Sequence, residues 1–172
     1  MSEGYLKRLQ DQWNREGLLA GGSPVLVSFS GGPDSVCLVR LLNLIYPNRL
    51  LKLVYFDHGL RSKEELERER QWISDFAFRL NLSVRCVKIP VSKYSDRFGV
   101  SIEMAGRQLR QKWLLHLARQ LGAECVVTGH HRQDYIETVL FRLATGALSR
   151  LGHFSSKILL GKEPQISFEK PL

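Results

Sequence analysis

The turn at residues 30–35 combines the residue types that bind a phosphate group at the start of a helix. It reads Ser-Gly-Gly-Pro-Asp-Ser and separates two apolar runs. Backbone N–H groups and the positive end of the helix dipole attract an anion there, and glycines let the backbone come close to it. Asp34 adds a negative charge, which suits a phosphate only if a cation such as Mg²⁺ lies between them. The turn therefore predicts a phosphate and metal site, with Ser30 and Ser35 as hydroxyl donors.

Two better-known phosphate-binding patterns are absent from the sequence. It contains neither Gly-x-x-x-x-Gly-Lys-Ser/Thr nor Gly-x-Gly-x-x-Gly, which excludes a Walker A loop and a dinucleotide fingerprint. The alternative is a glycine-rich turn between a strand and a helix, in which Ser or Asp merely caps the helix. The occurrence of strand, turn and helix in this order favours the phosphate site.

Two further polar segments follow apolar runs and could contribute to the same site. Residues 57–61 read Asp-His-Gly-Leu-Arg, and residues 129–134 read Gly-His-His-Arg-Gln-Asp. Between them, Arg107 and Arg110 stand three residues apart, so they share nearly the same face of a helix. Glu103 lies four residues before Arg107 and could hold either arginine by a salt bridge. Helix capping, packed histidines and a solvated basic face are the simpler alternatives.

Apolar periodicity places these polar segments at the ends of strands. Four short apolar runs predict buried strands at residues 25–29, 50–56, 84–89 and 125–128. Helical spacing predicts helices at residues 2–16, 34–46, 62–80, 102–121 and 134–144, with a polar loop at 90–100. Ser101 is expected to cap the helix that follows it, and Gly122 to end it.

Strands that alternate with helices predict an α/β fold with a mostly parallel sheet and helices on both faces. Ligands bind at the carboxyl ends of the strands in such sheets. Residues 1–24 are expected to form a leading helix and linker, and residues 25–172 a single domain.

Composition is that of an ordinary globular protein with an excess of positive charge. Of the 172 residues, 44% are hydrophobic and 24% are charged, and the net charge is +8. The excess suits an anionic partner such as nucleic acid, although a basic protein without such a partner has the same composition. No apolar stretch reaches the roughly 18 to 20 residues that span a membrane, and the N-terminus has no signal-peptide core. We therefore expect a cytoplasmic protein with no membrane contact.

The cysteines and tryptophans carry no visible chemistry. None of the cysteines forms a Cys-x-x-Cys pair, which excludes a zinc ribbon and a disulfide framework. Each lies in an apolar run, so we expect small core residues at Cys37, Cys86 and Cys125. Core packing is also the expectation for Trp13, Trp72 and Trp113, which stand at helical apolar spacing.

Taken in order, the motifs resemble a known enzyme family. Ser-Gly-Gly-Pro-Asp-Ser is similar to the signature of the PP-loop ATP pyrophosphatases. Together with the segments at residues 57–61, 101–110 and 129–138, it resembles the N-terminal catalytic domain of tRNA(Ile)-lysidine synthetases, from about Val25 to Leu172. The resemblance implies that ATP adenylates the C2 oxygen of the wobble cytidine in a tRNA(Ile) with a CAU anticodon. Free L-lysine then attacks C2 and expels AMP, so the enzyme is an ATP-dependent ligase that forms a carbon–nitrogen bond.

The resemblance also implies roles for particular residues. Asp34, Arg110 and Asp134 would be catalytic, and Asp34 and Asp134 would hold Mg²⁺. The expected ATP contacts are Ser30, Gly31, Gly32, Pro33, Asp34, Ser35, Asp57, His58, Arg107 and His131. Helix capping is the alternative for both aspartates, and a solvated basic face for the arginines.

The chain departs from the family pattern at several positions. Gln133-Asp134-Tyr135 replaces an Asp-Asp-Gln run, Gly106 replaces an alanine, and Thr145 replaces a basic residue. The family continues beyond the position of Leu172, so we expect a chain truncated at its C-terminus. The competing functions are a tRNA thiolase, a small-molecule ligase, a metal phosphohydrolase suggested by the histidines, and a non-catalytic nucleotide-binding module.

Overall fold

The computed structural model describes residues 3–19, 21–129, 157–160 and 166–169. The helices in this part of the chain are α1 (Glu3–Arg15), α2 (Pro33–Ile45), α3 (Lys63–Arg79), α4 (Val91–Phe98) and α5 (Ile102–Leu121). The strands are β1 (Val25–Ser28), β2 (Leu51–Asp57), β3 (Ser83–Lys88), β4 (Cys125–Thr128), β5 (Lys157–Leu160) and β6 (Ile166–Glu169). The expected helix at residues 134–144 lies outside the described residues.

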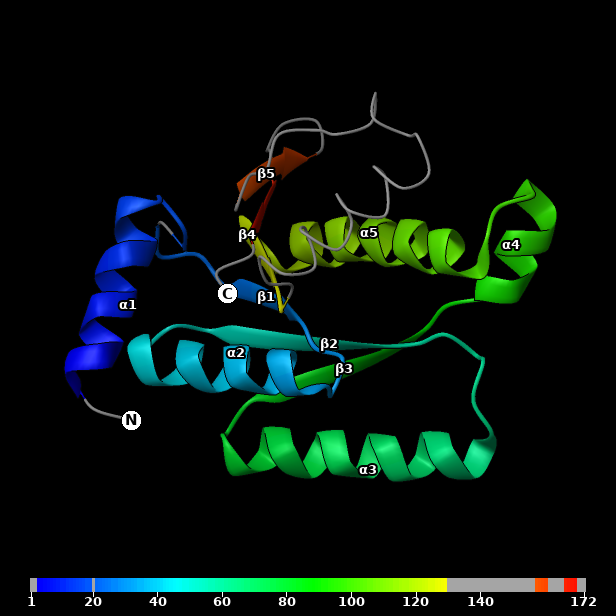
Figure 1. Ribbon diagram of the computed structural model, residues 1–172, viewed down its shortest axis with the longest axis horizontal. Helices are drawn as coiled ribbons and strands as arrows, with labels where there is room; N and C mark the ends of the chain where they lie inside the picture. The colour runs from blue at the N-terminus through cyan, green and yellow to red at the C-terminus, as the bar shows by residue number, and fades with distance from the viewer. Residues whose placement is uncertain (1–2, 20, 130–156, 161–165, 170–172) are drawn as a thin grey trace, which may run out of the picture.

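The strands form one sheet in the order β3-β2-β1-β4-β6-β5 (Figure 1). All neighbouring pairs are parallel except β5 and β6, which are antiparallel. The chain runs from β1 outward to β2 and β3, and then crosses to β4 on the other side of β1. The predicted mostly parallel α/β sheet is thus confirmed, and its order reverses between β1 and β4.

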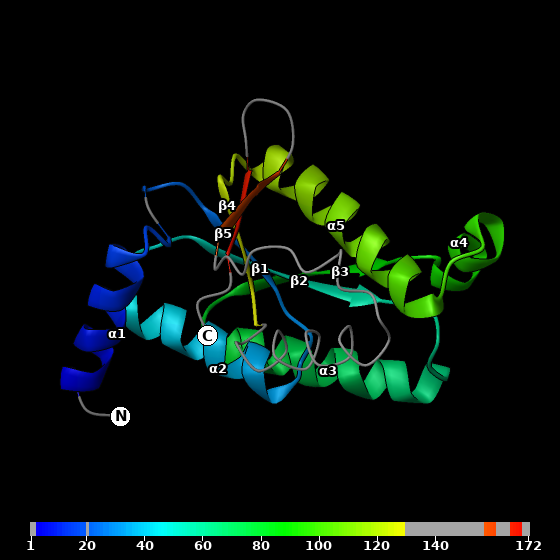
Figure 2. The same cartoon turned by 45° about the horizontal axis from the view of Figure 1, so that its top comes forward.

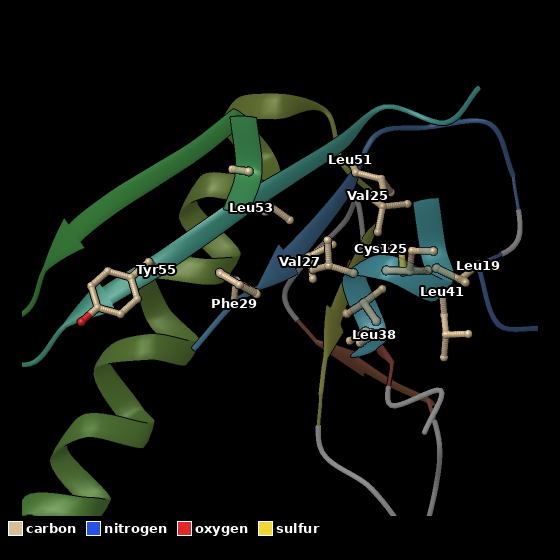
Figure 3. Packing of buried hydrophobic residues seen from close by; sticks show 14 of the residues in the cluster. Leu19, Val25, Val27, Phe29, Leu38, Leu41, Leu51, Leu53, Tyr55 and Cys125 are labelled. Atoms are coloured by element: carbon tan, nitrogen blue, oxygen red, sulfur yellow. The ribbon is translucent and has the colours of Figure 1, made fainter. Parts of the chain in front are cut away.

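Helices cover both faces of the sheet, as the sequence predicts. Figure 1 shows α2 and α3 below the sheet and α5 above it, and Figure 2 shows the same layers after a 45° turn. Alternate residues of the central strands enter the two cores, because side chains of a strand point to opposite faces in turn. Val25 and Val27 pack with α2 and α3, whereas Leu26 packs with α5. Figure 3 shows the first of these cores, including Phe29 beyond the end of β1.

The leading helix is part of this first core. Trp13 of α1 is completely buried and stacks on Tyr46, just beyond α2. The prediction that Trp13 is a core residue is therefore confirmed, whereas the expected domain boundary at residue 24 stays a prediction.

Local signals explain where α3 and α5 begin and end. Ser62 and Glu65 form a reciprocal capping box at the start of α3. Ser101 accepts a hydrogen bond from Met104 N at 3.2 Å, and Gly122 ends α5 with a left-handed φ of 62°. Both predictions for α5 are confirmed, because side-chain caps and glycines satisfy the backbone groups that helix ends leave unpaired.

Several expectations about the elements and the core are wrong. Residues 91–98 form α4 instead of a loop. Cys37 and Cys86 are exposed, since Cys37 lies on the solvent side of α2 and Cys86 on the edge strand β3, so only Cys125 is a core cysteine. Trp72 is 46% exposed, although it stacks on Phe76. Within the described residues, no helix is long and apolar enough to cross a membrane.

Candidate active site

A cleft of about 370 Å³ opens at the carboxyl ends of the central strands. It lies where the strand order reverses between β1 and β4, the place at which open α/β sheets bind ligands. Side chains and backbone from β1, β2, β4, α2, α3 and α5 meet in its wall. The lining residues are Ser28, Phe29, Ser30, Gly32, Asp34, Ser35, Tyr55, Phe56, His58, Arg61, Glu69, Arg110, Thr128 and Gly129.

The turn between β1 and α2 is held in shape by its own hydroxyl groups. The Ser35 Oγ accepts hydrogen bonds from Ser30 N at 3.3 Å and from Ser30 Oγ at 3.1 Å, and donates to Gly32 O at 2.9 Å. Gly31 has a φ of 78°, a left-handed conformation that glycine adopts without strain. Ser35 is 4% exposed. In this structure its hydroxyl shapes the turn, so it is a support as well as a predicted ligand contact.

The start of α2 faces the cleft without a side-chain cap. Gly32 is the N-cap and Pro33 the first helical residue, so no side chain of the cap closes the helix end. The Ser or Asp cap considered as an alternative is therefore not the arrangement observed. A helix N-terminus in this state is a site for an anion, and Asp34 lines the cleft beside it.

Gly129, at the end of β4, packs directly on the start of α2. A Cβ atom at this position would lie 3.0 Å from both Ser35 N and Ser35 Cα, and 3.2 Å from the carbonyl carbon of Asp34. These three atoms belong to the backbone and cannot rotate away. The absence of a side chain at Gly129 is thus what lets β4 and the turn at residues 30–35 approach each other across the point where the strand order reverses.

On the opposite wall, Arg110 of α5 reaches His58 at the end of β2. The distance between Arg110 Nη1 and His58 Nε2 is 2.9 Å. Burial, followed by the nearby Arg110 and Arg61, lowers the pKa of His58 below its ordinary value. Burial and the neighbouring Arg107 also lower the pKa of Arg110, which remains a cation because arginine starts so high.

The buried Asp57 stabilises the loop that carries His58. Its carboxylate is 3% exposed, accepts a hydrogen bond from Gly59 N at 2.8 Å and pairs with Arg70 at 3.2 Å. Both oxygen atoms are therefore engaged in holding the loop that carries His58. Asp57 is not one of the described residues that line the cleft, and its expected contact with ATP stays a prediction.

A third cluster in the cleft was not predicted from the sequence. Glu69 of α3 accepts a hydrogen bond from Tyr55 Oη at 2.5 Å and forms an ion pair with Arg61. A signal for Glu69 was present, because it follows Leu66 by three residues and precedes Ile73 by four, which places a carboxylate on the apolar face of α3.

The structure brings together about half of the predicted site residues. Ser30, Gly32, Asp34, Ser35, His58 and Arg110 line one cleft. Arg107 is exposed on α5 outside the lining, and neither arginine forms an ion pair with Glu103 in the part of the chain that is described. Gly31 and Pro33 shape the turn without lining the cleft. Asp134 and His131 lie outside the described residues.

Solved structures with a similar fold include a tRNA thiolase and an NMN synthetase. The U34-tRNA thiolase of Methanococcus maripaludis, solved with its 4Fe–4S cluster, superimposes with a TM-score of 0.73 at 18% identity, over 99% of this chain and 60% of that one. The NMN synthetase of Francisella tularensis has a TM-score of 0.60 at 14% identity, over 78% of this chain and 57% of that one. At these identities the likeness concerns the fold alone.

Curated relatives at higher identity are tRNA(Ile)-lysidine synthases. The protein from Dehalococcoides mccartyi (strain CBDB1) is 32% identical over 84% of this chain and 31% of its own length. The protein from Symbiobacterium thermophilum is 37% identical over 83% of this chain and 30% of its own length. The chain therefore spans less than a third of the length of these relatives. A family model described as a PP-loop domain matches residues 3–161, so the chain belongs to the PP-loop domain family of ATP-binding domains.

Proposed function

We propose that this chain is the catalytic nucleotide-binding part of a tRNA(Ile)-lysidine synthase. The observation that carries the proposal is the cleft in which the phosphate turn, Gly129 and Arg110 meet at the carboxyl ends of the strands. The curated relatives have the same proposed activity in their names. The substrates would be ATP, free L-lysine and a tRNA(Ile) with a CAU anticodon, all of which are available in the cytoplasm.

The proposed reaction has two steps. The C2 oxygen of the wobble cytidine attacks the α-phosphorus of ATP, a new oxygen–phosphorus bond forms, and pyrophosphate leaves. The ε-amine of lysine then adds to C2, the bond between C2 and the adenylated oxygen breaks, and AMP departs with that oxygen. The lysine ammonium gives one proton to solvent before it attacks, and the nitrogen gives a second proton to solvent after the new bond has formed. The product carries a carbon–nitrogen bond between cytidine and lysine.

Described residues supply the electrostatic part of the first step. The start of α2 offers backbone N–H groups to the phosphates. The Ser35 hydroxyl stabilises the turn from which these N–H groups point into the cleft. Arg110 places a guanidinium on the opposite wall, where it can stabilise the charge that develops during adenylation. Glu69, which accepts a hydrogen bond from Tyr55, adds a negative charge to the cleft, so the lining carries charges of both signs.

The residues present also fit Mg²⁺. Magnesium in nucleotide sites is usually held by one or two carboxylates together with the substrate phosphates. Asp34 provides one carboxylate at the cleft, and we propose Asp134, outside the described residues, as the second. Within the described residues, no group of three or more metal-ligating side chains is found. Bound there, Mg²⁺ would neutralise phosphate charge.

The competing thiolase function is not favoured by the cysteines. All three lie within the described residues, on α2, β3 and β4, and two of them are exposed on separate elements. They therefore provide no cluster of thiolates of the kind that holds an iron–sulfur centre.

The test is lysine-dependent turnover with defined RNA. We expect pyrophosphate and AMP release from ATP and Mg²⁺ when both lysine and a tRNA(Ile) with a CAU anticodon are present, with lysine incorporated into the RNA by mass. The matched control is the same RNA with uridine at the wobble position, which should support neither product. Equal pyrophosphate release with both RNAs, or lysine-independent AMP release with no change in RNA mass, would refute the proposed substrate.

A further inference from the structure

We propose that His58 is a positioning residue whose neutral imidazole holds the Arg110 guanidinium against the cleft. This inference rests on the proposed function, because it takes the phosphates of ATP as the partner of Arg110. It assigns His58 a role other than the ATP contact expected from the sequence, and it makes the activity sensitive to acid in a defined way.

The contact itself dictates the protonation state of the ring. Arg110 Nη1 and His58 Nε2 are 2.9 Å apart. An arginine side chain has only N–H donors, so His58 Nε2 must be the acceptor. The ring is therefore neutral and carries its proton on Nδ1 in this arrangement. A doubly protonated ring would place two donors and two positive charges against each other.

The surroundings of the pair restrict it and favour the neutral ring. Gly106 of α5 closes one side, because a Cβ there would lie 3.5 Å from His58 Cδ2 and 3.6 Å from Arg110 Nη1. The charged groups that face the ring are Arg110 on α5, Arg61 in the following loop and Asp57 on β2. Burial, then Arg110 and Arg61, lower the pKa of His58, while Asp57 opposes them. The ring is thus a neutral acceptor at physiological pH.

Protonation of His58 has opposite effects on binding and on catalysis. A protonated ring loses the acceptor at Nε2 and repels Arg110, so the guanidinium leaves its position. The cleft as a whole gains one positive charge, which by itself strengthens its attraction for ATP. We therefore expect kcat to fall as the pH drops through the pKa of His58, while KM for ATP does not rise.

Steady-state kinetics against pH test this split. With the concentration of neutral lysine amine held constant across the pH series, kcat of wild type for pyrophosphate release should fall by about tenfold per pH unit below the pKa of His58, as for any single essential deprotonated group. H58Q keeps an amide oxygen as acceptor but cannot titrate, so it should remove this acid limb. H58A should lower kcat by about tenfold or more at neutral pH, the scale of a misplaced catalytic group. The matched control is H116Q, at an exposed histidine on α5, the helix that carries Arg110, which should keep the wild-type profile.

Nuclear magnetic resonance of the histidine rings tests the pairing without catalysis. The His58 signals are those missing from the spectrum of H58Q. We expect the Nδ1–H tautomer at neutral pH and a pKa of His58 below its ordinary value in wild type, and a higher pKa for His58 in R110M. An Nε2–H tautomer, an unchanged pKa in R110M, or an acid limb that persists in H58Q would overturn the proposal. Absence of lysine-dependent turnover in wild type, with the expected tautomer present, would instead refute the proposed function alone.

Discussion

Replacing Gly129 by alanine tests whether close packing of β4 on α2 shapes the phosphate turn. The added Cβ would lie 3.0 Å from Ser35 N and Cα, against the roughly 3.5–4.0 Å at which non-bonded atoms are most stable. The end of β4 and the start of α2 must therefore separate by about 0.5 Å or more. The φ of Gly129 is not in the left-handed region, so the effect is steric and not conformational.

The expected cost follows from overpacking of a site that cannot rotate away. Such changes destabilise by about 1–3 kcal/mol, and 1 kcal/mol shifts the melting temperature of a domain of this size by about 2–4 °C. We therefore expect G129A to melt about 2–12 °C below wild type. ATP affinity, measured by isothermal titration calorimetry with Mg²⁺, should fall by about tenfold or more, because the turn that we propose binds the phosphates moves.

Gly106 provides the matched control, as a glycine on a neighbouring wall with room for a methyl group. A Cβ there would make ordinary contacts of 3.5–3.8 Å with His58 and Arg110. Alanine stabilises a helix interior by about 0.5–1 kcal/mol relative to glycine, so G106A should melt about 1–4 °C above wild type. If G129A melts as high as wild type and binds ATP equally well, the close approach does not shape the site.

Three further changes address the cleft and its supports. Asp34→Asn should lower pyrophosphate release by about 10²-fold or more while the melting temperature stays close to wild type, since the change removes the carboxylate that we propose holds Mg²⁺; wild-type turnover would exclude the metal role. Asp57→Ala should lower the free energy of unfolding, measured with denaturant, by about 1–3 kcal/mol, because Arg70 and Gly59 N both lose their carboxylate partner. Ser62→Ala should cost about 0.5–2 kcal/mol by the same measurement through loss of the capping box, with nucleotide affinity unchanged.

The central strands and α5 could be predicted because their signals are local. The runs that became β1, β2 and β4 are apolar on both faces, as buried parallel strands require. Ser101 and Gly122 mark the ends of α5 with residues whose roles are chemical. The cleft residues after β1 and β2 follow from the same signals, since the carboxyl ends of parallel strands meet at one edge of the sheet.

The missed features depend on contacts between elements. Helix α4 shows Val91, Tyr94 and Phe98 at helical spacing, but its polar sequence resembles a loop, and it is held through Tyr94 Oη, which donates to Gln108 on α5 at 2.9 Å. Cys86 lies in an apolar run like a core residue, yet β3 is an edge strand with an exposed face. Glu69 resembles the solvated charges around it until Tyr55 and Arg61 are placed beside it.

The pairing of β1 has a consequence for how the protein matures. Val25 pairs with Leu51 on one side and with Cys125 on the other. During synthesis, β1, β2 and β3 can associate before residue 125 exists, but one edge of β1 then lacks a partner, and Gly129 does not yet rest on Ser35. A nucleotide whose site includes both walls would bind only the chain in which this long-range contact has formed. Nucleotide binding would therefore stabilise the completed sheet relative to partly assembled chains. ATP in the cell would in this way favour the folded domain over precursors with unpaired strand edges, which are prone to aggregate.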